Sequence, residues 1–233
     1  MEVISVGKNY DNKKQLIDKE KDYDIKEAMT LVRDLSYTKF DGTVEASFKL
    51  GIDVRHSDQQ VRGTLTLPHG LGKKIRVAVI TKEDKVAEAN EAGADVVGGD
   101  DLIENIKKGF LDFDVLIATP NMMSKTGPLG KILGRRGLMP NPKTGTVTTD
   151  IKKAVKEFKE GKVEYRADKF GIIHMPIGKV SFAAEKLLDN FRIVYDTIVR
   201  VKPSSSKGQY MRSIALAPTM GPSVKVDTQK VKF

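Results

Sequence analysis

The sequence predicts a mixed α/β and α+β protein of two domains, in which an α+β domain from both ends of the chain is interrupted by a Rossmann-like α/β domain. Residues near both termini alternate apolar and polar side chains, as half-buried antiparallel strands do. The middle carries short apolar runs typical of buried parallel strands. We expect a split domain of residues 1–67 and 161–233 and an inserted Rossmann-like domain of residues 68–160.

The N-terminal segment predicts two helices followed by a strand. The first helix is expected over residues 9–18, and the second starts at Asp24, whose side chain can cap it. The second helix has an apolar stripe at helical spacing, formed by Ile25, Ala28, Met29, Val32 and Leu35. After a turn at Asp41-Gly42, apolar residues occupy every second position from Val44 to Ile52, which predicts a half-buried strand with a polar outer face. Residues 61–67 are interpreted as the partner of that strand.

The pattern changes after Pro68. Residues 75–80 and 115–118 form short apolar runs of the kind buried in parallel sheets. They are separated by expected helices and a short strand, at residues 83–92, 96–97 and 100–108. This β-α-β-α-β order predicts a small parallel sheet covered by helices.

From Gly161 the alternating pattern returns. Residues 163–166 and 172–175 are expected to form a hairpin around a turn at residues 167–171. The long amphipathic helix that follows has an apolar stripe formed by Leu187, Leu188, Phe191, Val194 and Ile198. The last strands are expected at residues 210–217 and 223–226, around the turn Thr219-Met220-Gly221-Pro222.

Composition makes a polyanion the expected partner. The 233 residues carry a net charge of +9, and each phosphate that a basic side chain neutralises releases condensed counterions. The absence of cysteine excludes disulfides, thiolate chemistry and zinc ribbons. No apolar run approaches the roughly 20 residues of a membrane span, and the N-terminus lacks the apolar core of a secretory signal. We therefore expect a cytoplasmic protein without a membrane partner.

Basic residues are concentrated in two stretches that contain no acid. The first, residues 115–149, contains Lys125, Lys131, Arg135, Arg136 and Lys143. The second, residues 197–226, contains Arg200, Lys202, Lys207, Arg212 and Lys225. Two solvated basic loops are the simpler explanation, but two such stretches among 31 acids favour a shared anionic partner. Three glycines, two prolines and three basic residues in residues 133–147 predict a rigid, extended basic loop, the alternative being a structural crossover.

The main alternative function is a soluble nucleotide-dependent enzyme that uses the insert as its cofactor domain. A phosphate-binding loop would follow the first buried strand, but residues 81–85 contain no glycine. Gly98-Gly99-Asp100 can bind an anion at a helix start, although such a sequence is more often a turn. The three histidines show no metal-ligand spacing, and no nucleophile motif occurs. We therefore expect no catalytic residues, no metal and no cofactor.

Several glycine- and proline-rich segments together resemble one known family. They follow one another along nearly the whole chain: residues 40–45, 50–53, 61–64, 67–73, 93–95, 134–147 and 219–223. In these segments the chain resembles the bacterial-type family of large-subunit ribosomal protein one, the protein of the mobile stalk beside the tRNA exit site. Gly42 departs from the family pattern, because glutamate is expected there, and this loosens the turn without changing a residue expected to contact RNA.

The resemblance implies the split architecture and the binding of large-subunit rRNA by the split domain. It also implies that the same surface binds a similar structure in the mRNA of the protein's own operon, so that excess protein represses its own translation. The stalk would move with deacylated tRNA as it leaves the exit site. The implied partners are large-subunit rRNA, exit-site tRNA and the protein's own mRNA, and we expect a monomer off the ribosome.

The resemblance also implies the residues of the RNA surface. Carried over position by position, they are Phe40, Thr43, Glu45, Ser213, Thr219, Met220 and Gly221. Weaker candidates for phosphate contacts are Lys39, Arg55 and Arg62. Arg135 and Arg136 are candidates for the backbone of tRNA or rRNA.

The chemistry of these side chains agrees with a surface that recognises RNA shape. Thr43 and Glu45 lie on the polar face of the predicted strand, where a hydroxyl can bond a 2′-OH or a base edge. Gly221 permits close backbone approach, and Met220 can pack on a ribose or base. Two alternatives stay open. Glu45 can instead pair with a basic residue on a neighbouring strand, and Phe40 can belong to the core.

Overall fold

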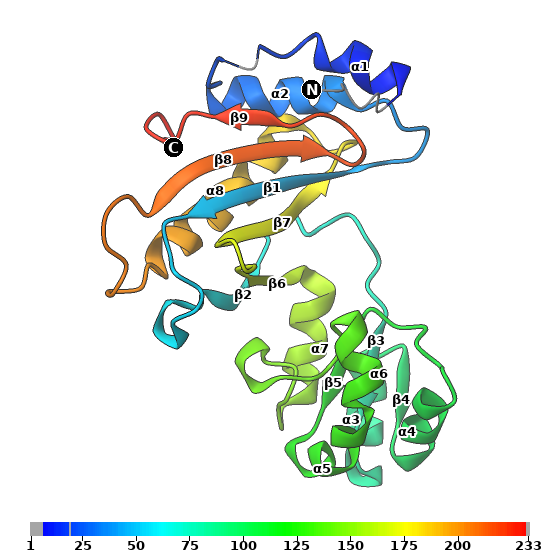
Figure 1. Ribbon diagram of the computed structural model, residues 1–233. Coiled ribbons are helices and arrows are strands. Elements are labelled where there is room, and N and C mark those ends of the chain that lie inside the picture. Colours follow the sequence, from blue (N-terminus) through cyan, green and yellow to red (C-terminus); the bar gives the residue numbers. More distant parts are fainter. Residues whose placement is uncertain (1–6, 19, 232–233) are drawn as a thin grey trace. The chain divides into compact units, whose positions relative to one another are not determined.

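The computed structural model describes residues 7–18 and 20–231, and it mixes helices with several sheets, as the sequence predicts (Figure 1). The chain folds into two compact units. Unit 1 contains Met1–Gly72 and Tyr165–Phe233, and unit 2 contains Lys73–Glu164. Among the described residues, no helix combines the length and the apolar character needed to cross a lipid bilayer.

Unit 1 is built on a four-stranded antiparallel sheet in the order β7-β1-β8-β9 (Figure 1). Its strands are β1 (Thr43–Leu50), β7 (Ile172–Lys179), β8 (Met211–Pro218) and β9 (Val224–Val226). In β1 the buried residues are Val44, Ala46, Phe48 and Leu50, at every second position. Since successive side chains of a strand point to opposite faces, the predicted half-buried strand is confirmed.

Helices cover the buried face of this sheet. All five residues of the predicted stripe are buried in α2 (Ile25–Leu35), and Asp24 caps the helix by accepting a hydrogen bond from the Lys26 backbone N–H at 3.2 Å. In α8 (Ala184–Arg200) the stripe is also buried, apart from Leu188, which is half-buried. The Phe191 ring stacks on Phe48 of β1 with centroids 5.7 Å apart. By contrast, α1 (Lys8–Lys14) is shorter than the helix predicted at residues 9–18 and buries none of its residues.

Two predicted strand pairings are wrong. The strand β2 (Arg62–Thr66) does not pair with β1, because β7 and β8 occupy both edges of β1; it pairs with β6 (Lys162–Arg166) in a two-stranded sheet. The predicted hairpin at residues 163–175 exists only at its turn, where Ala167 forms an isolated bridge to Ile173 before the strands join separate sheets. Alternation shows which face of a strand is buried, but it does not show which strand lies beside it.

Unit 2 contains a parallel sheet of three strands in the order β4-β3-β5: β3 (Val77–Ile80), β4 (Val96–Gly98) and β5 (Val115–Ala118). All residues of β3 are buried, as its apolar run predicts. Its residues alternate between two cores. Ala78 and Ile80 pack with α4 (Asp100–Lys107), whereas Val77 and Val79 pack with α3 (Val86–Glu91) and α7 (Ile151–Glu160).

The remaining elements are short. One-turn helices precede β2 and α3, at η1 (Ser57–Gln59) and η2 (Glu83–Lys85). Between β5 and α7 the chain forms η3 (Pro120–Met122), α5 (Met123–Thr126), η4 (Gly127–Leu129), α6 (Gly130–Leu133), η5 (Gly134–Arg136) and η6 (Pro142–Thr144). The basic loop at residues 133–147 is therefore partly helical rather than extended. Backbone bonds close its single turns, from the Gly137 N–H to the Gly134 carbonyl at 3.2 Å and from the Gly145 N–H to the Pro142 carbonyl at 3.1 Å.

Candidate nucleic-acid interface

The turn between β8 and β9 is fixed to the start of β1. The Thr219 backbone N–H donates to the Thr43 carbonyl at 2.8 Å, and the Thr219 hydroxyl donates to the same oxygen at 3.1 Å. In return, the Thr43 N–H donates to the Thr219 hydroxyl oxygen at 2.9 Å. These three reciprocal hydrogen bonds make the turn a rigid extension of the sheet, although Thr43 and Thr219 are 176 residues apart in the sequence. It brings the predicted residues Thr43 and Thr219 together.

Met220 has an unusual backbone conformation in this turn. Its φ of 64° is the only positive value of a non-glycine residue among those described, and such conformations cost about 1–3 kcal/mol. The hydroxyl of Tyr37 donates to the Met220 carbonyl at 2.7 Å, and the Gly221 N–H donates to Pro218 at 2.9 Å. At Gly221 a Cβ would lie 2.5 Å from Pro218, so the turn requires glycine there. The backbone is therefore held in a conformation that projects the Met220 side chain.

Two apolar side chains are exposed at this end of the sheet. Phe40 is 57 % exposed and Met220 is 67 % exposed. The alternative in which Phe40 belongs to the core is therefore wrong. Exposed apolar side chains that lie together mark surfaces on which a partner packs. Phe40 precedes Thr43 and Met220 follows Thr219, and hydrogen bonds fix the backbone of these two threonines to each other.

The sheet face opposite the helices is open. Its positions on β1 are Thr43, Glu45, Ser47 and Lys49, of which Glu45 and Lys49 are exposed. The residues directly opposite Glu45 are Pro176 and Ala217, so neither in-register neighbour is basic. The alternative pairing of Glu45 with a basic residue is not supported by this register. A lysine is instead found beside Thr43, where Lys179 donates to the Thr43 hydroxyl at 3.1 Å.

Other predicted residues lie away from the turn. Ser213 is exposed on the open face opposite Lys49, six residues from Thr219 along β8, which is roughly 20 Å at the rise of a strand. Lys39 is exposed next to Phe40. The structure does not bring the remaining two phosphate candidates to the turn: Arg55 is exposed in the connection after β1, and Arg62 lies on β2 in the other sheet.

Arg135 and Arg136 belong to unit 2. Both are exposed and lie in the single turn η5, which ends at the left-handed Gly137 with φ of 70°. The stretch of sequence that contains them, residues 115–149, has no acidic residue. They therefore remain candidates for contact with a nucleic-acid backbone.

Sequence reasoning missed Tyr37 and Lys179, the two residues that hold the turn and Thr43. Tyr37 lies 183 residues from its partner Met220, and Lys179 lies 136 residues from Thr43. Neither residue has a local pattern that could have identified it, because such contacts are made only by the folded chain.

The cavity that a nucleotide-binding enzyme would use has unsuitable chemistry. It measures about 530 Å³ and lies at the carboxyl ends of β3 and β4, where Gly98-Gly99 precedes α4. Asp84, Asp100 and Asp101 line it, and they repel a phosphate. Two lysines also line it, Lys82 and Lys125, and the Lys125 ammonium is bound to Asp100 at 2.7 Å.

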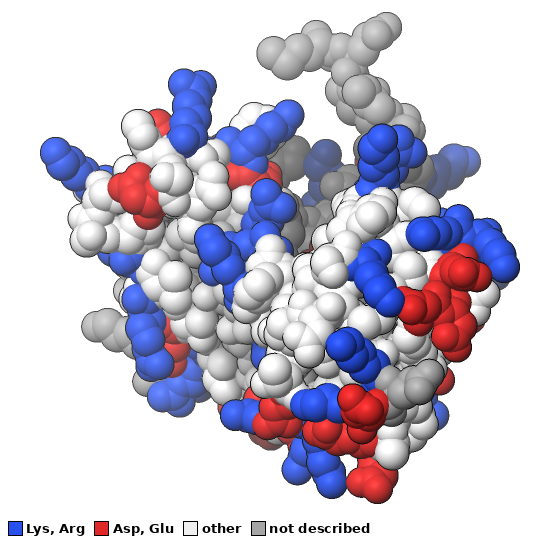
Figure 2. Space-filling model, turned by 90° about the horizontal axis from the view of Figure 1, so that it is seen from below, with Lys and Arg blue, Asp and Glu red and all other residues white. Residues whose placement is uncertain are grey.

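Among the described residues, no group of three or more acidic, histidine or cysteine side chains is arranged to hold a metal ion. Lys and Arg are scattered over the face seen in Figure 2, with Asp and Glu among them. On this face the basic side chains do not form one large patch.

Comparison with known proteins gives two findings. The pattern of the Ribosomal protein L1p/L10e family matches residues 32–222. A curated protein from Solidesulfovibrio magneticus, named large ribosomal subunit protein uL1, is 58 % identical over 226 residues, which cover 97 % of this chain and 96 % of that protein. The matched range includes the turn at residues 219–221 and both exposed apolar side chains described above.

Proposed function

Because the chain belongs to the ribosomal protein L1p/L10e family, we propose that it is a structural, non-catalytic component of the large ribosomal subunit that binds large-subunit rRNA. The observation that carries this proposal is the rigid turn at residues 219–221, which projects an exposed methionine beside Thr43. A fixed apolar side chain surrounded by hydroxyls suits the ribose and base edges of folded RNA. The relative from S. magneticus is named as a protein of the same subunit.

Each residue of the surface has a separate role in this proposal. Met220 and Phe40 pack on riboses or bases, and Thr43 offers its hydroxyl to a 2′-OH. Glu45 accepts a hydrogen bond from a 2′-OH or an amino group, because a carboxylate beside phosphates is otherwise unfavourable. Gly221 allows the RNA backbone to approach closely. Thr219 positions the turn, and Ser213 extends the surface to the far end of the open face.

Three finer roles complete the proposal. The same surface would bind an rRNA-like structure in the protein's own operon mRNA and repress its translation. The protein would assist release of deacylated tRNA from the exit site, with Arg135 and Arg136 near the tRNA or rRNA backbone. Lys39, Arg55 and Arg62 would contact phosphates. The protein would work in the cytoplasm on the ribosome and be a monomer off it.

The two units are proposed to act as two domains, with the discontinuous one as the main RNA binder. A chain of residues 1–72 joined by a short flexible linker to residues 165–233 is expected to bind a large-subunit rRNA transcript within about fivefold of the whole chain. The predicted surface residues other than the pair Arg135 and Arg136 all lie in that unit. Dissociation constants at one fixed salt concentration measure this, and loss of most of the affinity would contradict the assignment.

The enzyme alternative has its own test. Titration of the whole chain with ATP, GTP and NAD is expected to show no micromolar binding, since acids line the unit 2 cavity. Micromolar nucleotide affinity together with absent rRNA affinity would favour that alternative.

Tyr37→Phe is expected to weaken rRNA binding about fivefold with little change in the free energy of unfolding. The substitution removes only the hydroxyl that donates to Met220, and such a bond contributes about 1 kcal/mol. Without it the Met220 backbone can leave its unfavourable conformation. Tyr195→Phe on α8, the helix that packs on the other face of the sheet, is the matched control and should bind RNA like the wild type. An unchanged affinity of Tyr37→Phe would show that the bond does not position Met220.

A further inference from the structure

A second exposed aromatic side chain lies at the opposite end of the open sheet face. Phe170 is 68 % exposed, more than any other large apolar side chain among the described residues. It occupies the turn between β6 and β7, where polar residues are usual. A single exposed apolar side chain is common on protein surfaces, so the case for a binding role depends on what surrounds the ring.

The turn holds the backbone at Phe170 in one conformation. The Asp168 carboxylate accepts hydrogen bonds from the Phe170 and Ile172 backbone N–H groups at 2.9 and 2.8 Å. The bonds from Ile172 and Phe170, together with nearby positive charge, lower the pKa of Asp168 below its ordinary value. Gly171 has a φ of +73° and lies against Ile52, and its carbonyl accepts a bond from Leu50 at the end of β1. Little ordering of the ring would be needed on binding.

An open depression of about 420 Å³ lies beside the ring. It is lined by Ile52, Asp53, Val54, Arg55, Lys169 and Phe170. The Lys169 ammonium lies 5.1 Å from the centre of the Phe170 ring, so a cation and an aromatic face are presented together. The two nearby carboxylates accept backbone hydrogen bonds. Asp53 accepts one from the Arg55 N–H at 3.0 Å, and Asp168 accepts one from the Phe170 N–H at 2.9 Å. An aromatic face with two cations is the combination that binds an unpaired base and its phosphates.

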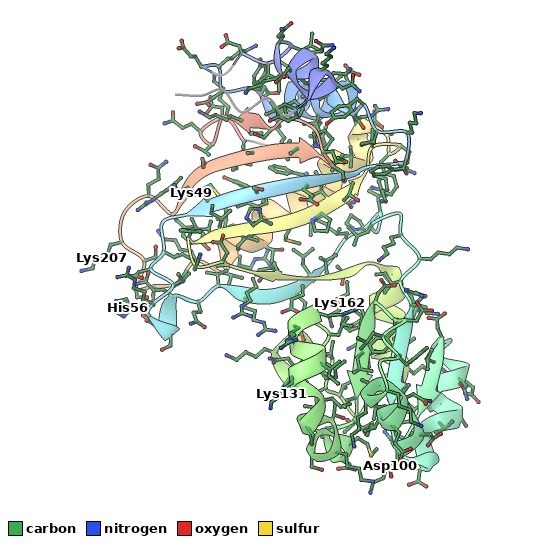
Figure 3. All side chains as sticks on the ribbon, turned by 45° about the vertical axis from the view of Figure 1, so that its right-hand side comes forward. Lys49, His56, Asp100, Lys131, Lys162 and Lys207 are labelled. Atoms are coloured by element: carbon green, nitrogen blue, oxygen red, sulfur yellow. The ribbon has the colours of Figure 1, made fainter. Side chains whose placement is uncertain are left out.

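Further basic side chains lie near the depression, beside the acids Asp53 and Asp58. Lys49, His56 and Lys207 lie at this end of unit 1 (Figure 3). Lys207 belongs to the acid-free stretch 197–226, and Lys49 faces the open side between Ile172 and Ser213. From Thr43 to Leu50 the strand β1 spans roughly 25 Å. An RNA that lies along this face from Met220 therefore reaches the depression.

We propose that Phe170 stacks on an unpaired base of the bound RNA, while Arg55 and Lys169 contact the phosphates beside that base. This site is a second anchor for the same RNA and rests on the proposed function. The cations favour a nucleic acid over a second copy of this basic chain, since two copies with a net charge of +9 each repel one another.

The test compares variants of the whole chain on one large-subunit rRNA transcript. Phe170→Ala is expected to weaken binding about five- to tenfold, and Phe170→Tyr to restore most of the affinity, because a tyrosine ring also stacks. Arg55→Ala and Lys169→Ala should each lower the slope of log K against log salt by about one, whereas Phe170→Ala should leave that slope unchanged. All three positions are exposed and line the depression, and thermal unfolding should confirm intact folding of the four variants.

The outcomes separate this site from the proposed function. If the wild type binds the transcript and Phe170→Ala binds equally well, the second anchor is wrong and the proposed function stands. If the wild type does not bind the transcript, the proposed function is wrong. If Phe170→Ala changes only self-association in sedimentation experiments, the surface contacts protein and the proposal is overturned.

Discussion

Replacing Met220 with aspartate is expected to weaken binding to large-subunit rRNA about 5- to 150-fold, or about 1–3 kcal/mol. The substitution removes an exposed thioether from a fixed turn and brings a carboxylate close to phosphates. Aspartate tolerates a positive φ better than methionine does. The backbone of the turn should therefore persist, and the loss should come from the contact with RNA. Equilibrium binding at one fixed salt concentration measures it.

Two controls sharpen this experiment. Met220→Leu keeps an apolar side chain and is expected to retain most of the affinity. Val199→Asp makes the same change of charge at a 43 % exposed position on α8, the helix on the other face of the sheet, and should affect binding little. A dissociation constant for Met220→Asp equal to that of the wild type would remove this turn from the interface.

Asn190→Leu is expected to lower the free energy of unfolding by about 3–5 kcal/mol. Asn190 is fully buried in α8; its carbonyl oxygen accepts the His69 N–H at 3.2 Å, and its amide donates to the Gly70 and Ile177 carbonyls at 3.1 and 2.7 Å. A leucine leaves all three backbone groups without this partner. An unsatisfied buried group such as the Ile177 carbonyl costs about 1–3 kcal/mol, and the His69 and Gly70 groups are part-buried and add a smaller loss. Leucine favours helix more than asparagine does, so helix propensity cannot explain a loss.

Urea denaturation followed by circular dichroism measures this effect. Lys186→Ala, at an exposed position of the same helix, is the control and should change stability by less than about 0.5 kcal/mol. A loss below about 1 kcal/mol for Asn190→Leu would show that the segment at His69 and Gly70 does not depend on the helix. The first segment of unit 1 ends at Gly72, two residues after Gly70. The loss of stability therefore also measures how strongly the bonds to Asn190 anchor the end of that segment.

Local patterns predicted elements well and pairings poorly. The alternation from Val44 to Leu50 and the stripe of α2 are confirmed because a buried face imposes the period of the element itself. The run at residues 77–80 is confirmed for the same reason, with helices on both of its faces. The predicted pairing of β2 with β1 was wrong. Strands that are consecutive in sequence are often, but not always, neighbours in a sheet, and here later strands pair with both edges of β1.

The candidate site shows the same limit. Sequence indicated that Thr43 and Glu45 face away from the core, and the open sheet face confirms this orientation. It did not reveal the left-handed conformation of Met220 or the bond from Tyr37, since both depend on the folded neighbourhood. The segment at residues 167–171 was correctly interpreted as a turn, but the exposure of the Phe170 ring became apparent only in the folded chain, where Asp168 and Ile52 contact the turn backbone. RNA contacts themselves remain a prediction.

The placement of β1 has a consequence for how the protein is made. Both strands that border β1 lie beyond residue 171, after the whole of unit 2, and the bonds to Thr43 come from Thr219. During synthesis β1 therefore has no strand to pair with until most of the polypeptide has been translated. Pairing between strands so far apart in sequence is slow to form. A truncated nascent chain has neither the turn nor the sheet beside it. In the proposed function, therefore, only a finished copy would present the complete RNA surface.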